Sequence, residues 1–171
     1  MSPLPVWDSE AEALETIAHF TVAAKAYCSL IENLPDVDQQ ESAHQLSVAL
    51  SELYAAAHHL KSPINISDDD RTARLSDERR TELSGPLWDK LEPFDFFQFF
   101  FSPFEDKEPT GTGLTILLID VYEDVKEGLL LIEMQADPEH VQWEWWWGFE
   151  NHWGKHAIDA MKALQSVMWP W

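Results

Sequence analysis

Hydrophobic residues recur at three- and four-residue steps in four segments of the chain, a spacing that predicts four amphipathic α-helices. These helices are expected over residues 9–34, 39–61, 114–132 and 138–168. Only residues 35–38 connect the first two, so these two helices should pack side by side and antiparallel.

Two of the helix starts carry capping signals. Ser9 and Glu12 have the spacing of a capping box, in which both side chains satisfy free backbone N–H groups. Asp137 can cap the last helix, and Pro138 suits its first turn because the N–H that proline lacks would be unpaired there.

Residues 62–113 interrupt the helical pattern and contain five of the ten prolines. Within them, Ser76–Leu83 predicts a short helix capped by its first or second residue. The aromatic run Phe94–Phe101 has no clean period and fits either a short strand or a buried turn. Because an exposed run of this kind promotes aggregation, we expect it to fold onto the helices.

The pattern as a whole predicts an all-α fold in a single domain over residues 1–171. Its architecture would be a helical bundle of four main helices, with the irregular phenylalanine-rich segment between helices two and three.

The third helix has a clear apolar face and an acidic flank. Placing successive residues 100° apart puts one set of apolar side chains on one side, namely Leu114, Leu118, Val121, Val125, Leu129 and Ile132. Asp120, Asp124 and Glu127 fall together on the flank. Carboxylates grouped in this way can bind a divalent cation. In a chain with 31 acidic residues, however, a solvated polar face is the simpler interpretation.

The last helix contains the densest aromatic segment, since residues 143–156 hold five of the nine tryptophans and two of the seven histidines. Such a cluster is either the centre of the core or an aromatic binding wall. The helical wheel predicts an apolar side formed by Trp143, Trp146, Trp147, Trp153, Ala157, Met161, Leu164 and Met168. Glu150 falls in the middle of that side, where a carboxylate has to be paired, hydrogen-bonded or protonated. It is a candidate functional residue or a structural partner of indole N–H groups.

Trp145, Phe149, His152 and His156 fall along a third strip of the same wheel. The two histidines are four residues apart, a spacing at which both can bind one metal ion. A zinc-protease motif would continue with a glutamate after the first histidine, and Trp153 occupies that position. Histidines that bond to backbone or carboxylate groups, or that act as general acid and base, are the alternatives.

The net charge of −20 limits the classes of partner. An acidic surface repels nucleic acids and anionic membranes, so neither is expected as a partner. No segment approaches the length of a membrane span, and the N-terminal residues lack the features of a signal peptide, which predicts a cytoplasmic protein. The single cysteine, Cys28, lies on an apolar stripe and should be a core residue.

Residues 114–164 resemble a bacterial family, the domain-of-unknown-function family numbered 5063. Residues 117–128 are similar to a family helix that reads Asp-Ile-Tyr-x-Asp-Leu-Lys, and residues 152–164 to a terminal helix that reads His-Trp-Gly-x-His-Ala-x-x-Ala-Leu. The resemblance implies an all-helical bacterial cytosolic domain without a known activity. It marks Asp120, Tyr122, Asp124, His152, Trp153 and His156. Gln165 and Ser166 stand where the family often has a closing Leu-His, so a metal site that used this histidine would be incomplete here.

The leading hypothesis is a protein-binding or regulatory module, similar in kind to an immunity protein, whose acidic face meets a basic partner. It rests on the charge, the small size and the lack of a complete catalytic motif. The sequence has no phosphate-binding loop, dinucleotide fingerprint, Cys-x-x-Cys pair or Gly-x-Ser-x-Gly turn, and it predicts no cofactor. The acidic face would consist of Asp120, Asp124 and Glu127.

Two alternatives remain open. The first is an enzyme or sensor that binds a divalent metal through side chains of helices three and four, which requires an aspartate within ligand distance of both histidines. Its candidate ligands are Asp120, Asp124, His152 and His156. The second is a small-molecule pocket walled by Trp145, Phe149 and residues 96–101, which requires a sizeable apolar cavity. The pattern does not specify an oligomeric state.

Overall fold

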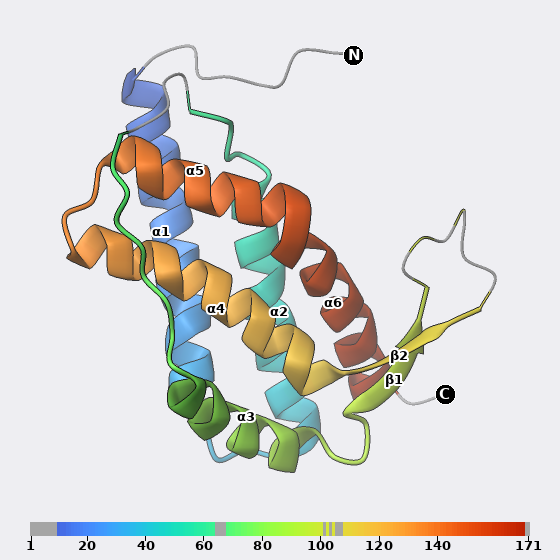
Figure 1. The fold of residues 1–171 in the computed structure, drawn as a ribbon. Coiled ribbons are helices and arrows are strands. Elements are labelled where there is room, and N and C mark those ends of the chain that lie inside the picture. Colours follow the sequence, from blue (N-terminus) through green and yellow to red (C-terminus); the bar gives the residue numbers. More distant parts are fainter. Residues whose placement is uncertain (1–9, 64–67, 101, 103, 105–107, 170–171) are drawn as a thin grey trace.

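The computed structural model describes residues 10–63, 68–100, 102, 104 and 108–169. Most of them are helical (Figure 1), and the last three helical segments run on without a break. The helices are α1 (Glu10–Glu32), α2 (Gln39–Ala57), α3 (Asp77–Leu91), α4 (Leu114–Glu133), α5 (Pro138–Gly148), the π-helical turn η1 (Phe149–Trp153) and α6 (Gly154–Met168). Strands β1 (Phe96–Phe99) and β2 (Thr110–Gly113) form an antiparallel pair. The all-α prediction is thus correct for most of the chain but misses this small sheet.

The apolar faces of α1, α2, α4 and α6 enclose one cluster of buried side chains. As the linker length predicts, α1 and α2 run antiparallel, while α6 packs against α2 and α4 and α4 packs against α1 (Figure 1). Cys28 is in this cluster, and its burial raises the pKa of the thiol to about 12, so it acts as an apolar core residue. No helix in the described part of the chain has the length and apolar character that crossing a membrane requires.

The apolar residues that recur at three- and four-residue steps in the first three helices are mostly buried, although Leu14 near the start of α1 is exposed. On α4, all but the last predicted apolar position are buried, and Ile132 is exposed near the end of the helix. The second helix ends at Ala57, four residues before the predicted end, although Leu60 is still buried. The capping box predicted at the start of α1 involves Ser9, which lies outside the described residues.

The helix predicted over Ser76–Leu83 is longer than expected. Ser76 caps α3 by accepting a hydrogen bond from Arg79 N, but the helix continues through Pro86 to Leu91. A proline inside a helix removes one backbone hydrogen bond. Leu83, Leu87 and Leu91 are buried on either side of Pro86, and this packing keeps the helix continuous.

Within the phenylalanine run, Phe96–Phe99 form a strand rather than a buried turn, and the hairpin of β1 and β2 projects from the helices (Figure 1). Phe97 packs against the core, but Phe96 is 71% exposed and Phe100 is 46% exposed. The expectation that the whole run folds onto the helices is therefore wrong. Alternation explains the difference, because successive side chains of a strand point to opposite faces and only one face meets the helices. The outward ring of Phe96 instead lies over Gly111 of β2, where a Cβ atom would be 2.7 Å from it.

The last helix contains a π turn, η1, that the helical wheel did not take into account. Its buried positions 145, 149, 153 and 157 are four residues apart, and each such step overshoots a full α-helical turn by about 40°. The π turn η1 absorbs one residue and resets the phase, so that both halves of the helix face the core. The predicted apolar side is consequently only partly correct. Trp146 and Trp153 are buried as predicted, but Trp143, Trp147 and Glu150 are exposed. Trp145 and Phe149, which the wheel put on another strip, are buried instead.

Candidate functional site

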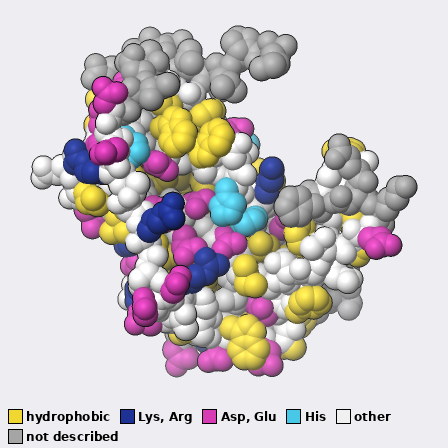
Figure 2. All heavy atoms as spheres, in the orientation of Figure 1, with side chains coloured by type: hydrophobic (Ala, Val, Ile, Leu, Met, Phe, Trp, Pro, Cys, Tyr) yellow, Lys and Arg dark blue, Asp and Glu magenta, His cyan; other side chains and the backbone are white. Residues whose placement is uncertain are grey.

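The structure brings together four of the predicted site residues on one face of the protein. Asp120 and Asp124 lie one turn apart on α4, while His152 lies on η1 and His156 one turn further along, on α6. The two imidazole rings meet edge to face, with their centroids 4.6 Å apart. Figure 2 shows histidine side chains near the middle of one face, with acidic and basic side chains around them.

Three of these residues have the placement of metal ligands. One ligand atom each from Asp120, His152 and His156 lies within 4.8 Å of the other two. The Nδ1 atom of His156 is 3.3 Å from Oδ2 of Asp120 but is not aligned for a hydrogen bond with it. Two ligands bound tetrahedrally at 2.0–2.1 Å from one ion are about 3.3–3.4 Å apart, so this pair has the separation of neighbouring ligands.

Asp124 holds His152 in position. Its Oδ2 is 2.7 Å from Nδ1 of His152, which leaves the Nε2 atom of that ring free to bind an ion. A carboxylate on the second nitrogen of a metal-binding histidine fixes the tautomer and the orientation of the ring. Asp124 therefore has the geometry of a supporting residue rather than of a ligand.

Arg80 of α3 occupies the other side of Asp120. Its Nη2 atom is 2.6 Å from Oδ1 of Asp120, and its Nη1 atom bonds to Glu123. Burial alone would raise the pKa of Asp120, but the adjacent His156 and Arg80 outweigh it and hold this pKa below its usual value. Asp120 is thus ionised at neutral pH, and its Oδ2 atom stays on the side of the histidines.

Two glycines make this local structure achievable. A Cβ atom on Gly154 would lie 2.3 Å from the carbonyl oxygen of Phe149, so the π turn requires glycine there. A Cβ atom on Gly148 would lie 3.0 Å from the Trp153 ring and 3.5 Å from Oδ2 of Asp124. The Trp-Gly-x-His sequence therefore combines the residue that permits the π turn with one of the site histidines.

The other predicted site residues lie elsewhere. Tyr122 points toward α1, where its hydroxyl donates a hydrogen bond of 2.7 Å to Glu32; burial and this contact raise the pKa of the phenol. Trp145 and Trp153 are fully buried, and Trp145 donates to the carbonyl oxygen of Val125 at 3.1 Å. These three residues stabilise the fold. Trp145 and Phe149 are core residues, so among the described residues they do not wall the pocket that they were predicted to form with the phenylalanine run.

Glu127 lies beyond Asp124 on the same helix. It lines a small hollow of about 90 Å³ together with Arg74 and Glu144. Burial, followed by the charge of Asp124, raises the pKa of Glu127 to about 7. Glu127 is therefore a weaker source of negative charge at neutral pH than the sequence suggests.

The sequence did not identify Arg80 as part of this site. Its neighbours along the chain are mostly charged, and no spacing connects residue 80 with residue 120. The same holds for Glu123, which is one of several acids on α4. The acidic flank of α4 was a signal that could have located this pair, because carboxylates that are partly buried need a basic partner, but the flank was interpreted as a solvated face.

The fold and site define a mostly helical protein with an Asp–His cluster between α4 and the last helix. Residues 12–169 match the model of the domain-of-unknown-function family DUF5063, and the chain belongs to this family. No curated protein matches the sequence. Among solved structures, the fold is similar to the crystal structure of protein BF1032 from Bacteroides fragilis. The TM-score is 0.78 at 18% identity, over 91% of this chain and 94% of that chain.

Proposed function

We propose that the protein is an enzyme or sensor that binds a divalent transition-metal ion through Asp120, His152 and His156. The observation that carries the proposal is the convergence of one ligand atom from each of these residues within 4.8 Å. Two imidazole nitrogens and one carboxylate oxygen favour Zn²⁺, Ni²⁺ or Co²⁺ over Mg²⁺ and Ca²⁺, which prefer oxygen ligands.

The surroundings of the three residues support this proposal. Buried polar atoms normally have hydrogen-bond partners, yet Nδ1 of His156 has no aligned partner in the described part of the chain. A π turn at the site also favours function, because such turns are rare and occur often at functional sites. Three protein ligands leave a fourth position open, as in catalytic metal sites.

Metal binding can be tested on protein purified without an affinity tag. Elemental analysis gives the bound metal, and thermal unfolding with added Zn²⁺ gives its effect on stability. At a free metal concentration of 100 times Kd, binding stabilises the folded state by about 2.7 kcal/mol. For a chain of this length that corresponds to a rise in Tm of roughly 5–10 °C.

The test variant and its control both replace exposed histidines, so neither should unfold the protein. His152→Ala should abolish the rise in Tm without unfolding the protein, because the His152 side chain is 53% exposed. His44→Ala is the matched control, since His44 is exposed on α2 and lies outside the site. A protein without bound metal whose Tm does not respond to Zn²⁺, or an equal loss in both variants, would contradict the proposal.

A second candidate is a binding module for a basic protein partner, and one observation favours it. Trp143 and Trp147 are 36% and 47% exposed, and their rings stack with centroids 5.6 Å apart and planes inclined by 5°. Cations bind well over tryptophan faces, and Glu144 lies between the two tryptophans in the sequence. By contrast, Asp120 and Asp124 already pair within the molecule.

An arginine-rich peptide and its uncharged citrulline counterpart would test this candidate by fluorescence titration. Replacing Trp143 and Trp147 with alanine should weaken binding of the arginine peptide at least tenfold. Trp88→Ala is the matched control, because Trp88 is 45% exposed on another helix. Equal affinity for the two peptides, or an equal effect of Trp88→Ala, would eliminate the candidate.

A further inference from the structure

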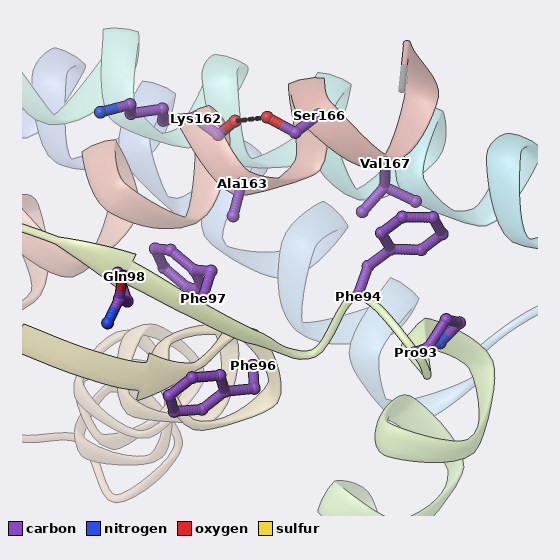
Figure 3. A pocket seen from close by; sticks show the side chains of 9 residues that line it. All are labelled: Pro93, Phe94, Phe96, Phe97, Gln98, Lys162, Ala163, Ser166 and Val167. Atoms are coloured by element: carbon purple, nitrogen blue, oxygen red, sulfur yellow. Dashed lines mark hydrogen bonds between the residues drawn. The ribbon is translucent and has the colours of Figure 1, made fainter. Parts of the chain in front are cut away.

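A hollow of about 240 Å³ lies between the start of the β hairpin and the end of α6. Figure 3 shows its two sides: Phe97 extends from β1 toward Ala163, and Phe94 extends toward Val167. The other residues that line it are Pro93, Phe96, Gln98, Lys162 and Ser166. The hollow is distinct from the Asp–His cluster, none of whose residues lines it.

The walls of this hollow are apolar and remain partly in contact with water. Phe94 is 37% exposed and Phe97 is only partly buried, so the two rings are not covered by the rest of the described chain. Apolar walls with a few polar groups at the edge are typical of pockets for small molecules. Pockets for drug-sized ligands have volumes of about 300–1,000 Å³, and this hollow is smaller. A ligand that fills it would therefore have on the order of ten non-hydrogen atoms.

The charge at the edge is unusual for this protein. Among the described residues that line the hollow, Lys162 alone is charged, whereas the chain as a whole carries −20. Asp159 lies one turn before Lys162 on α6. Burial raises the pKa of its carboxyl group, although the charges of His156 and Lys162 act in the opposite direction. The other polar residues of the lining are Gln98 on β1 and Ser166 on α6, and the Ser166 hydroxyl donates to the carbonyl oxygen of Lys162 (Figure 3).

We infer that this hollow binds a small amphipathic anion, an aliphatic or aromatic carboxylate of about eight carbons. The apolar part would lie between Phe94, Phe97 and Val167, and the carboxylate would face Lys162. In Figure 3 the Lys162 ammonium group points along α6 and away from the rings, so its flexible side chain has to turn toward the ligand. The proposal is independent of metal binding, because it concerns a different surface and other residues.

Octanoate is a suitable probe, and 1-octanol is an uncharged probe with the same number of carbons. We expect saturable binding of one octanoate per chain in NMR titrations, with shifts confined to residues that line the hollow. Ser166→Phe should weaken the binding of both probes at least tenfold, because Ser166 is exposed and a phenylalanine there would fill the hollow. Lys162→Gln should weaken octanoate about three- to fivefold, as for an exposed ion pair, and leave 1-octanol unchanged.

Lys155→Gln is the matched control, since Lys155 is exposed on α6 and does not line the hollow. Absence of saturable octanoate binding, or binding that Ser166→Phe does not change, would overturn the proposal. Equal effects of Lys162→Gln and Lys155→Gln on octanoate would overturn the assignment of an anionic ligand, because overall charge would then explain the result.

Discussion

Gly128 provides a direct test of how tightly α4 packs against the last helix. A Cβ atom at this position would lie 2.1 Å from Nε1 and 2.4 Å from Cε2 of Trp145. Carbon atoms in contact are about 3.5–4.0 Å apart, so in Gly128→Ala the indole ring would have to move by more than about 1 Å. Trp145 is fully buried, which leaves the ring no open space to enter.

The expected change in the free energy of unfolding has two destabilising contributions and one stabilising contribution. Forcing a methyl group into a packed core costs about 1–3 kcal/mol. Moving the indole also breaks its 3.1 Å hydrogen bond to Val125 O, and an unpaired buried N–H costs about 1–3 kcal/mol. The better helix propensity of alanine returns about 1 kcal/mol. Gly128→Ala should therefore destabilise the protein by about 3 kcal/mol and lower Tm by roughly 6–12 °C.

Urea unfolding followed by circular dichroism measures this difference directly. Gly85→Ala is the control, because a Cβ atom on Gly85 would have no neighbour within 4 Å. The gain in helix propensity there is offset by the following Pro86, so its stability should stay within about 0.5 kcal/mol of the parent. Adding Trp145→Phe to Gly128→Ala should cost less than the sum of the single changes, since the smaller ring relieves the clash. Equal stability of Gly128→Ala and Gly85→Ala would contradict the close packing of Gly128 against Trp145.

Three further predictions concern the site. Asp124→Asn removes the charge that orients His152, so Zn²⁺ affinity measured by calorimetry should fall about 10–100-fold, and an unchanged affinity would refute the supporting role of Asp124. In Gly154→Ala the new Cβ atom collides with the carbonyl oxygen of Phe149. The substitution should lower the free energy of unfolding by about 1–3 kcal/mol and also lower the Zn²⁺ affinity. If both quantities stay unchanged, the π turn tolerates a side chain at this position. Glu127 has a pKa raised to about 7, so its ionisation costs stability as pH rises from about 4.5 to about 7. Glu127→Gln should consequently be more stable than the parent at pH 8, by roughly 1 kcal/mol after solvent screening, and equally stable at pH 4; parallel pH profiles would contradict this.

The helices were predictable because burial follows a regular period along them. On α2 and α4 the period of the apolar residues matches the α-helix, and the predicted core positions are buried almost to the last residue. The hairpin was not predictable in the same way. Phe96 and Phe97 are chemically identical neighbours, and only the pairing with β2 decides which of them faces the helices.

The candidate site was partly predictable. The four-residue spacing of Asp120 with Asp124, and of His152 with His156, indicated two pairs that could each share one side of a helix. Their meeting depends on how α4 packs against the last helix, which no local pattern specifies. Arg80 could not be assigned for the same reason, since its partners are 40 and 43 residues away along the chain.

The π turn explains why the helical wheel placed some exposed tryptophans in the core, and it also shapes the candidate site. A regular helix over residues 138–168 would rotate α6 by about 100° relative to its present orientation, so either Trp145 or Leu164 would leave the core. Both are fully buried, which means that core packing alone favours the extra residue in the turn. That residue also turns His152 outward, toward Asp124, while Trp153 stays in the core. A turn that packs the core and orients a site histidine at once satisfies two requirements with one backbone distortion, and Gly154 is the residue that permits it.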